Sequence, residues 1–229
     1  MDLAGLLARA LAVVALLVLA SVAVRRSIAA THGGVIPDEG VSLRNAVEVI
    51  VEALTGLAKQ TMGAEWRKWF PFVGAMFFFI LIANLIGLIP GMAITDNVNV
   101  AAAWAIISYV LFNYVGIREH GIQHYLIKYM GPSFFTWHVG GKHIHMRLLA
   151  PLFLLLEIPL DLARVLTLTV RLIANMFADH TVVAVFLTLV PIGVPAIFIG
   201  LGVLVCVLQA FVFSLLTMIY INIALQEAH

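Results

Sequence analysis

The sequence predicts an all-α integral membrane protein with about five membrane-embedded helices and one amphipathic surface helix. Hydrophobic residues make up 63% of the 229 residues and charged residues only 11%, whereas a soluble domain is roughly half apolar and a quarter charged. Several runs also reach the ~20 apolar residues that a membrane-spanning helix needs. The net charge of +1 gives no indication of nucleic-acid binding. We expect residues 1–229 to form a single membrane domain.

The first predicted helix covers about residues 3–24, which are apolar apart from Arg9. A cleaved signal peptide is the alternative, because the run contains LASVA, which faintly resembles a cleavage site. However, the basic pair Arg25 and Arg26 follows the apolar run, whereas the basic residues of a signal peptide precede it. We therefore favour a retained membrane helix.

The second predicted helix, about residues 42–62, is amphipathic. Its apolar positions follow helical spacing, and its polar positions form the opposite face. The apolar face is Val47, Ile50, Val51, Leu54 and Ala58; the polar face is Arg44, Glu48, Glu52, Thr55 and Lys59. Such a helix is expected at the membrane surface or against a partner.

Four further helices are expected at about residues 69–90, 98–117, 148–190 and 195–226. Pro90 and Gly91 end the first of them, and the segment PIGVP at 191–195 separates the last two. Residues 181–226 hold no charge and exceed one crossing, which favours a break at that segment. The helix at 148–190 is too long for a perpendicular span, so the last two helices are expected to be long and strongly tilted.

Basic residues mark the cytoplasmic side of a membrane protein. Arg25, Arg26, Arg67, Lys68 and the loop 118–147 are therefore expected inside. With five crossings, the N-terminus is predicted outside and the C-terminus in the cytoplasm.

Six polar residues share one face of the predicted helix at 148–190. At 100° per residue they fall within about 80° of one another over ~33 Å. They are Glu157, Asp161, Arg164, Arg171, Asn175 and Asp179. Ionisable groups inside a membrane cost several kcal/mol unless they are paired or face water or protein, so this stripe needs an explanation.

The first three stripe residues, Glu157, Asp161 and Arg164, can pair with one another at helical spacing, which offers a purely structural explanation for them. Arg171 is different, because no acid lies one turn away on its own helix. The other predicted spans contain no Asp or Glu, which leaves only Asp96 in a linker. We favour a carboxylate from another subunit as the partner of Arg171.

The last predicted helix carries Gln209 in an apolar run, with Gly202 two turns before it. A buried Gln is most simply a packing hydrogen bond; opposite Arg171 it could also orient the guanidinium or hold water.

Four stretches of the sequence stand out: RLIANMFADH, LQAFVFSLLTMIYINIAL, and FFFILIANLIGLIPG with DNVNVAAA. The first resembles the fifth-helix signature of subunit a of F-type ATP synthases, the second resembles that family's last helix, and the other two resemble its earlier hairpin. The resemblance covers roughly residues 40–229 in order and implies an ion-translocating stator subunit with no catalytic site of its own. It also implies a ring of c subunits and b-type peripheral stalk subunits as partners, and protons or possibly sodium as the ion.

By position, the resemblance makes Arg171 the essential arginine of two proton half-channels. Asn175, Gln209, Glu157 and Thr167 match other polar positions of the family's ion path, and Arg164 matches an often basic position. An arginine stays protonated and so cannot relay a proton between the half-channels.

Two residues depart from the family pattern. Asp179 stands where the family usually has a small residue, and Gly202 where it often has His or Glu; His180 matches a position that is commonly Glu or His. We hypothesise that Asp179, with His180, supplies the titratable group of the outer half-channel, and that Gly202 leaves room for it.

Other kinds of site have weaker support. His120 and His124, with His143 and His145 nearby, could bind a metal or haem, but a loop at the membrane surface explains them more simply. Haem ligation would need paired histidines inside spans, and only His180 lies within one. A single cysteine, Cys206, excludes an internal disulfide. No cofactor is expected. A stand-alone channel or secondary transporter remains the alternative function, although no internal repeat supports it.

Overall fold

The computed structural model describes residues 3–30, 42–89, 97–128, 135–139, 142–146, 150–189 and 193–226. Its helices are α1 (Leu3–Ala30), α2 (Leu43–Met62), the short η2 (Gly63–Glu65), α3 (Trp66–Gly87), α4 (Val98–Lys128), α5 (Ala150–Leu189) and α6 (Val194–Gln226). Two short strands, β1 (Phe135–Val139) and β2 (Lys142–Met146), form an antiparallel hairpin.

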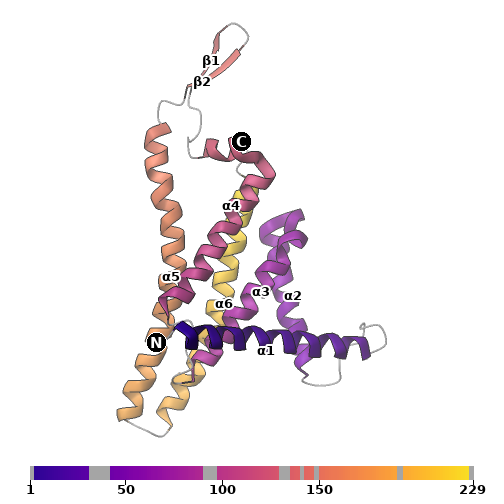
Figure 1. The fold of residues 1–229 in the computed structure, drawn as a ribbon, viewed down its shortest axis with the longest axis vertical. Coiled ribbons are helices and arrows are strands. Elements are labelled where there is room, and N and C mark those ends of the chain that lie inside the picture. The colour runs from indigo at the N-terminus through magenta and orange to yellow at the C-terminus, as the bar shows by residue number, and fades with distance from the viewer. Residues whose placement is uncertain are drawn as a thin grey trace.

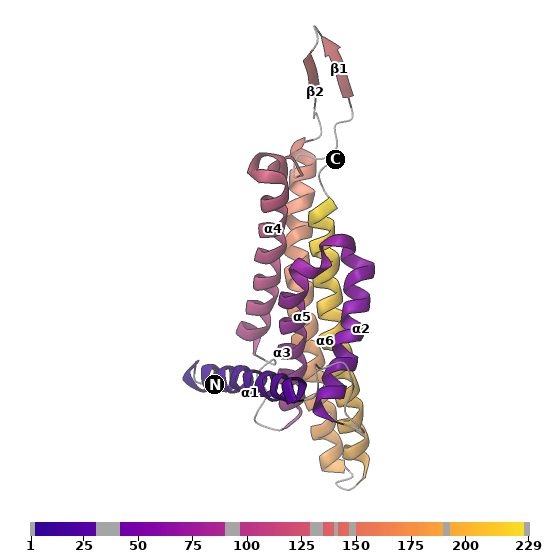
Figure 2. The same ribbon diagram turned by 90° about the vertical axis from the view of Figure 1, so that its right-hand side faces the viewer.

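The predicted all-α membrane class is confirmed. Five helical segments among the described residues are long and apolar enough to cross a membrane: Gly5–Ala29, Arg44–Gly87, Val98–Ile122, Pro159–Leu189 and Val194–Gln226. The hairpin of β1 and β2 is an addition that the sequence did not suggest, because its region was expected to be a loop. In Figures 1 and 2 it projects beyond the end of the helices.

Helix α6 lies at the centre of the bundle and packs against α2, α3, α4 and α5 (Figure 1). Its inward side chains meet the main hydrophobic core, where Phe213 of α6, Met76 and Ile80 of α3, and Leu172 of α5 are almost fully buried. Helix α5 packs mainly on α4 and α6. These contacts fix how the polar face of α5 is turned toward α6.

Helix α2 begins where the sequence predicted, with the Ser42 hydroxyl accepting a hydrogen bond from the Asn45 backbone N–H at 3.1 Å. Its apolar residues Leu54 and Ala58 are buried in the main core against α3 and α6 of the same chain. The cover that the sequence predicted for the apolar face is therefore supplied by other helices of the same chain.

The polar face of α2 also differs from the expectation at one position. Arg44 is 2% exposed, and its Nε donates to Glu48 Oε1 at 2.7 Å. Burying a guanidinium is costly unless it is paired, so Glu48 stabilises this buried end of α2.

Helix α1 continues through Arg25 and Arg26 to Ala30 and so is longer than predicted. It lies across the long axis of the other helices rather than parallel to them (Figures 1 and 2). Val13 packs on Phe79 and Ala83 of α3, while most other large side chains of α1 are exposed.

One end of the bundle brings together the start of α3 and the ends of α4 and α6. Lys68 of α3 forms an ion pair with Glu119 of α4. His120 Nε2 lies 3.1 Å from the carbonyl oxygen of Ala224 in α6. The next residue, Gly121, has a φ of 76°, which kinks α4 there. These contacts hold the three helix ends together.

Candidate functional site

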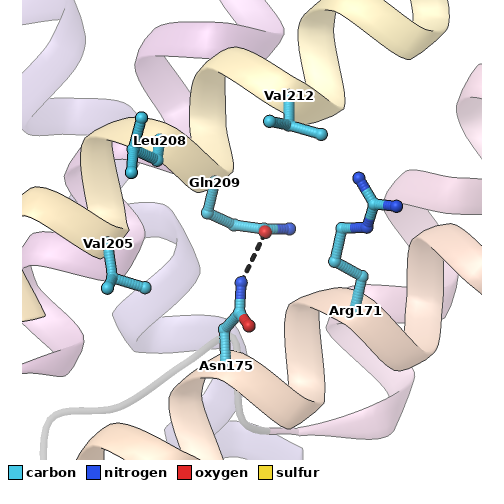
Figure 3. A pocket seen from close by; sticks show the side chains of 6 residues that line it. All are labelled: Arg171, Asn175, Val205, Leu208, Gln209 and Val212. Atoms are coloured by element: carbon cyan, nitrogen blue, oxygen red, sulfur yellow. Dashed lines mark hydrogen bonds between the residues drawn. The ribbon is translucent and has the colours of Figure 1, made fainter.

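The centre of the polar stripe lies where α5 packs against the antiparallel helix α6. Asn175 of α5 donates from Nδ2 to Gln209 Oε1 of α6 at 2.6 Å. A cavity of about 330 Å³ lies beside this bond, lined by Arg171, Asn175, Val205, Leu208, Gln209 and Val212 (Figure 3). The structure therefore brings together the three predicted site residues Arg171, Asn175 and Gln209.

Arg171 reaches from α5 toward α6 at the edge of this cavity (Figure 3). It is half-buried, while Leu168 and Leu172 beside it pack into the core. No ion pair or hydrogen bond joins Arg171 to another residue within the described ranges. A guanidinium has five N–H donors and no acceptor, so this group is available to a partner that supplies acceptors.

Gln209 adds a second donor to the cavity. The residue is 4% exposed, and its Oε1 already accepts from Asn175. Its Nε2 is buried and has no hydrogen-bond partner among the residues that the structure places. An amide nitrogen and a guanidinium are both donors, so they cannot satisfy each other. The two groups together favour an acceptor, such as a carboxylate, between the helices.

Seven residues before Arg171, the other stripe arginine is fully engaged. Arg164 Nη1 lies 3.0 Å from Asp161 Oδ1. Its guanidinium also lies over the rings of Phe112 in α4, at 5.9 Å, and Tyr220 in α6, at 5.2 Å. The structural explanation for this part of the stripe therefore holds for Asp161 and Arg164. The side chain of Glu157 lies outside the described part of the structure.

At the other end of the stripe, Asp179 and His180 face different helices. His180 Nε2 lies 2.7 Å from the carbonyl oxygen of Gly87 in α3. Asp179 is half-buried, and its Oδ2 has no hydrogen-bond partner among the described residues. A Cβ built on Gly202 would lie 3.8 Å from that Oδ2, so Gly202 of α6 is in contact range of Asp179.

Thr167 lies away from the cavity. Its side chain is exposed, and its hydroxyl donates to the backbone carbonyl of Ala163 at 2.7 Å. The hydroxyl hydrogen is thus already used within α5, whereas the oxygen keeps a lone pair for a partner outside this chain.

Asn84 of α3 is a polar residue that the sequence reasoning missed. It is 1% exposed, and its Oδ1 has no hydrogen-bond partner in the described ranges. The signal was visible in FFFILIANLIGLIPG, where Asn84 stands alone among apolar residues. A buried polar group in such a run is usually functional or hydrogen-bonded.

No group of three or more metal-binding side chains occurs among the residues that could be searched. His120 is engaged with Ala224 at the end of α6. The side chains of His124, His143 and His145 lie outside the described part of the structure.

The comparisons with known proteins agree on one family. A family model described as ATP synthase A chain matches residues 6–222. The ATP synthase subunit a of Bdellovibrio bacteriovorus is 39% identical over 208 residues, covering 90% of this chain and 85% of the relative. ATP synthase subunit a 1 of Syntrophotalea carbinolica is 43% identical over 188 residues, covering 82% and 74%. The subunit a of Geotalea daltonii is 36% identical over 218 residues, covering 95% and 86%. This chain therefore belongs to the ATP synthase subunit a family.

Proposed function

We propose that this chain, a non-catalytic membrane subunit of the F-type ATP synthase, moves ions by pairing Arg171 with carboxylates of a ring of c subunits. The observation that carries the proposal is the cavity between α5 and α6. There Arg171 and the Gln209 amide nitrogen present donors, and neither has an acceptor among the described residues. A carboxylate supplies the missing acceptors and the opposite charge.

The ion step follows from the electrostatics of this place. A carboxyl group that faces lipid is stable in its neutral form, because low dielectric disfavours charge. Beside Arg171 the anion is favoured, so the ring carboxyl releases its ion there. After it passes, it takes up another ion from the opposite half-channel. Arg171 stays charged throughout and cannot carry the proton across, which prevents a short circuit.

The two half-channels meet the ring on either side of Arg171. We assign Asp179, with His180, to the outer one, because Asp179 has an oxygen without a partner next to Gly202. Asn175, Gln209, Glu157 and Thr167 are further polar groups along the path. A transmembrane voltage supplies ~2.3 kcal/mol per charge per 100 mV, and ring rotation carries this work to the catalytic subunits of the complex.

The chain is a multi-pass protein of an energy-transducing membrane. We assign it to a bacterial inner membrane, with the N-terminus outside and the C-terminus in the cytoplasm. In support, the helix ends joined by Lys68, Glu119 and His120 gather basic residues at the end of the bundle near Ala224. We further propose b-type stalk subunits as partners that hold this chain against the ring.

A stand-alone channel or transporter that binds a free anion at Arg171 is the second candidate. The same donors in the cavity would accept such an anion. Isolation from native membranes separates the two: co-purification with small hairpin proteins that carry a membrane carboxylate supports the motor, and a homo-oligomer supports the channel.

The test of the motor itself is Arg171→Ala, with ion-driven ATP synthesis measured in membrane vesicles. We expect synthesis to be abolished while the complex still assembles, because Arg171 has no partner in the described structure to lose. Arg171→Lys is the matched control, since it keeps the charge but loses the planar guanidinium. ATP synthesis by the Ala variant at the parent rate would refute the proposal.

A further inference from the structure

We propose that His180 is a positioning residue that caps the end of α3 and thereby aims Asp179, while Asp179 alone exchanges the proton of the outer half-channel. This inference rests on the proposed function. It gives the titrating role in the outer half-channel to Asp179 and a positioning role to His180.

The cap consists of one hydrogen bond. His180 Nε2 lies 2.7 Å from the carbonyl oxygen of Gly87, the last residue of α3. The final four carbonyls of a helix have no N–H partner within that helix. Because a carbonyl only accepts, Nε2 must carry the hydrogen. It carries that hydrogen in both the protonated ring and the matching neutral tautomer, so the bond persists in both states.

The bond fixes α5 against a helix that it otherwise hardly touches. Helix α5 packs mainly on α4 and α6, and His180 extends this packing to α3. Leu88, the residue after Gly87, lies close to α6, since a Cβ on Gly202 would come within 2.8 Å of Leu88 Cδ2. Helices α3, α5 and α6 therefore meet at the level of His180.

Asp179 faces a different helix from its neighbour. Consecutive residues of a helix point about 100° apart, and while His180 reaches α3, Asp179 lies against Gly202 of α6. Its Oδ2 is buried and without a partner in the described ranges. A proton can be placed on this oxygen without breaking a bond, whereas transfer of the Nε2 hydrogen of His180 would break the bond to Gly87.

Two amide variants separate positioning from titration. In His180→Gln the side-chain nitrogen extends about as far as Nε2, so it can donate to Gly87. In His180→Asn the nitrogen is one methylene closer to the backbone and cannot reach. Neither amide titrates. Both are measured in vesicles that contain the complete ATP synthase, as proton conduction per assembled complex.

We expect the Gln variant to conduct protons about two- to tenfold faster than the Asn variant, the range that one net hydrogen bond gives. We also expect its conduction to follow the pH profile of the parent. Equal losses in both variants, or a shifted pH profile in His180→Gln, would show that the ring exchanges protons and overturn the proposal.

The same vesicles separate this proposal from the function on which it rests. ATP synthesis that survives Arg171→Ala overturns the motor, whereas equal Gln and Asn losses with an inactive Arg171→Ala overturn the cap alone. If His180→Asn does not assemble, the pH profile of His180→Gln decides: an unchanged profile supports the cap, and a shifted one refutes it.

Discussion

Helix α5 carries two arginines on one face, two turns apart, in opposite surroundings. Arg164 pairs with Asp161 at 3.0 Å and lies over the rings of Phe112 and Tyr220. Arg171 has no partner among the described residues and borders a cavity. The difference arises three residues earlier in each case, where Asp161 precedes Arg164 and Leu168 precedes Arg171. The paired Arg164 holds α5 against α4 and α6. The guanidinium of Arg171 keeps its donors available for a partner outside the described residues.

The acids of the stripe show the same contrast. Asp161 is 2% exposed and forms the ion pair with Arg164, whereas Asp179 has a buried oxygen without a described partner. The residue type and the helix face are therefore not enough to predict what a polar residue of the stripe does. The side chains that surround each residue decide this, and substitutions can change those side chains one at a time.

The largest effect on stability is expected from breaking the ion pair between Asp161 and Arg164. Arg164→Ala removes the cation that pairs with the buried carboxylate of Asp161, and breaking a buried pair costs about 3–5 kcal/mol. Because the Arg164 side chain is 22% exposed, we expect the lower end, about 3 kcal/mol. Thermal inactivation of the purified complex measures this loss.

The double variant Asp161→Ala with Arg164→Ala is the control for that measurement. It removes both charges, so it should recover part of the lost stability. An Arg164→Ala complex as stable as the parent would show that the contacts of Arg164 contribute nothing.

The next effect comes from giving Arg171 the partner that Arg164 has. Asn175→Asp keeps the side-chain shape and places a carboxylate one turn from Arg171, beside the same cavity. An internal ion pair competes with the ring carboxylate, so we expect ATP synthesis to fall about tenfold, the equivalent of ~1.4 kcal/mol.

Asn175→Ser is the matched control, because it also removes the hydrogen bond to Gln209 but adds no charge. A loss as large in Ser as in Asp would assign the effect to the hydrogen bond rather than to neutralisation of Arg171.

The smallest effect is expected at the unpaired acid. Asp179→Asn removes the titratable oxygen but keeps the side-chain size, so we expect proton conduction through membrane vesicles to slow several-fold while the complex remains intact. Asp161→Asn should do the reverse, lowering the stability of the complex with little change in conduction per complex. Conduction by Asp179→Asn at the parent rate would remove Asp179 from the ion path.

The sequence was sufficient to place the stripe, because helical spacing alone decides which residues share a face. It also separated Arg171 from Arg164, since the presence of an acid one turn away is a local property. It could not identify the partner of His180, because that partner is a backbone carbonyl of Gly87, which no side-chain pattern encodes. Asp179 and Gly202 both differ from the residues usual in the family, and we hypothesised from this that they lie opposite each other. The structure places the two residues in contact range.

The arrangement of the first two helices was beyond the sequence for a different reason. An apolar face predicts that a helix is covered, but not by what. For α2 the cover is α3 and α6. For α1, apolar length was compatible with a crossing. In the described structure Val13 and Leu17 pack against α3, while most other large side chains of α1 are exposed. Composition alone did not predict that this helix lies across the others.

The central position of α6 has a consequence for how the bundle is built. Helix α6 follows in the sequence all four helices that it touches, α2, α3, α4 and α5. Until it is synthesised, Met76 and Ile80 of α3 and Leu172 of α5 lack Phe213, which packs in the same core. Contacts between residues far apart in the sequence form slowly. We therefore expect the core between the earlier helices to stay incompletely packed until α6 is in place. A chain that stalls before residue 194 lacks every contact of α6, so we expect the other helices to pack less stably than in the full-length chain.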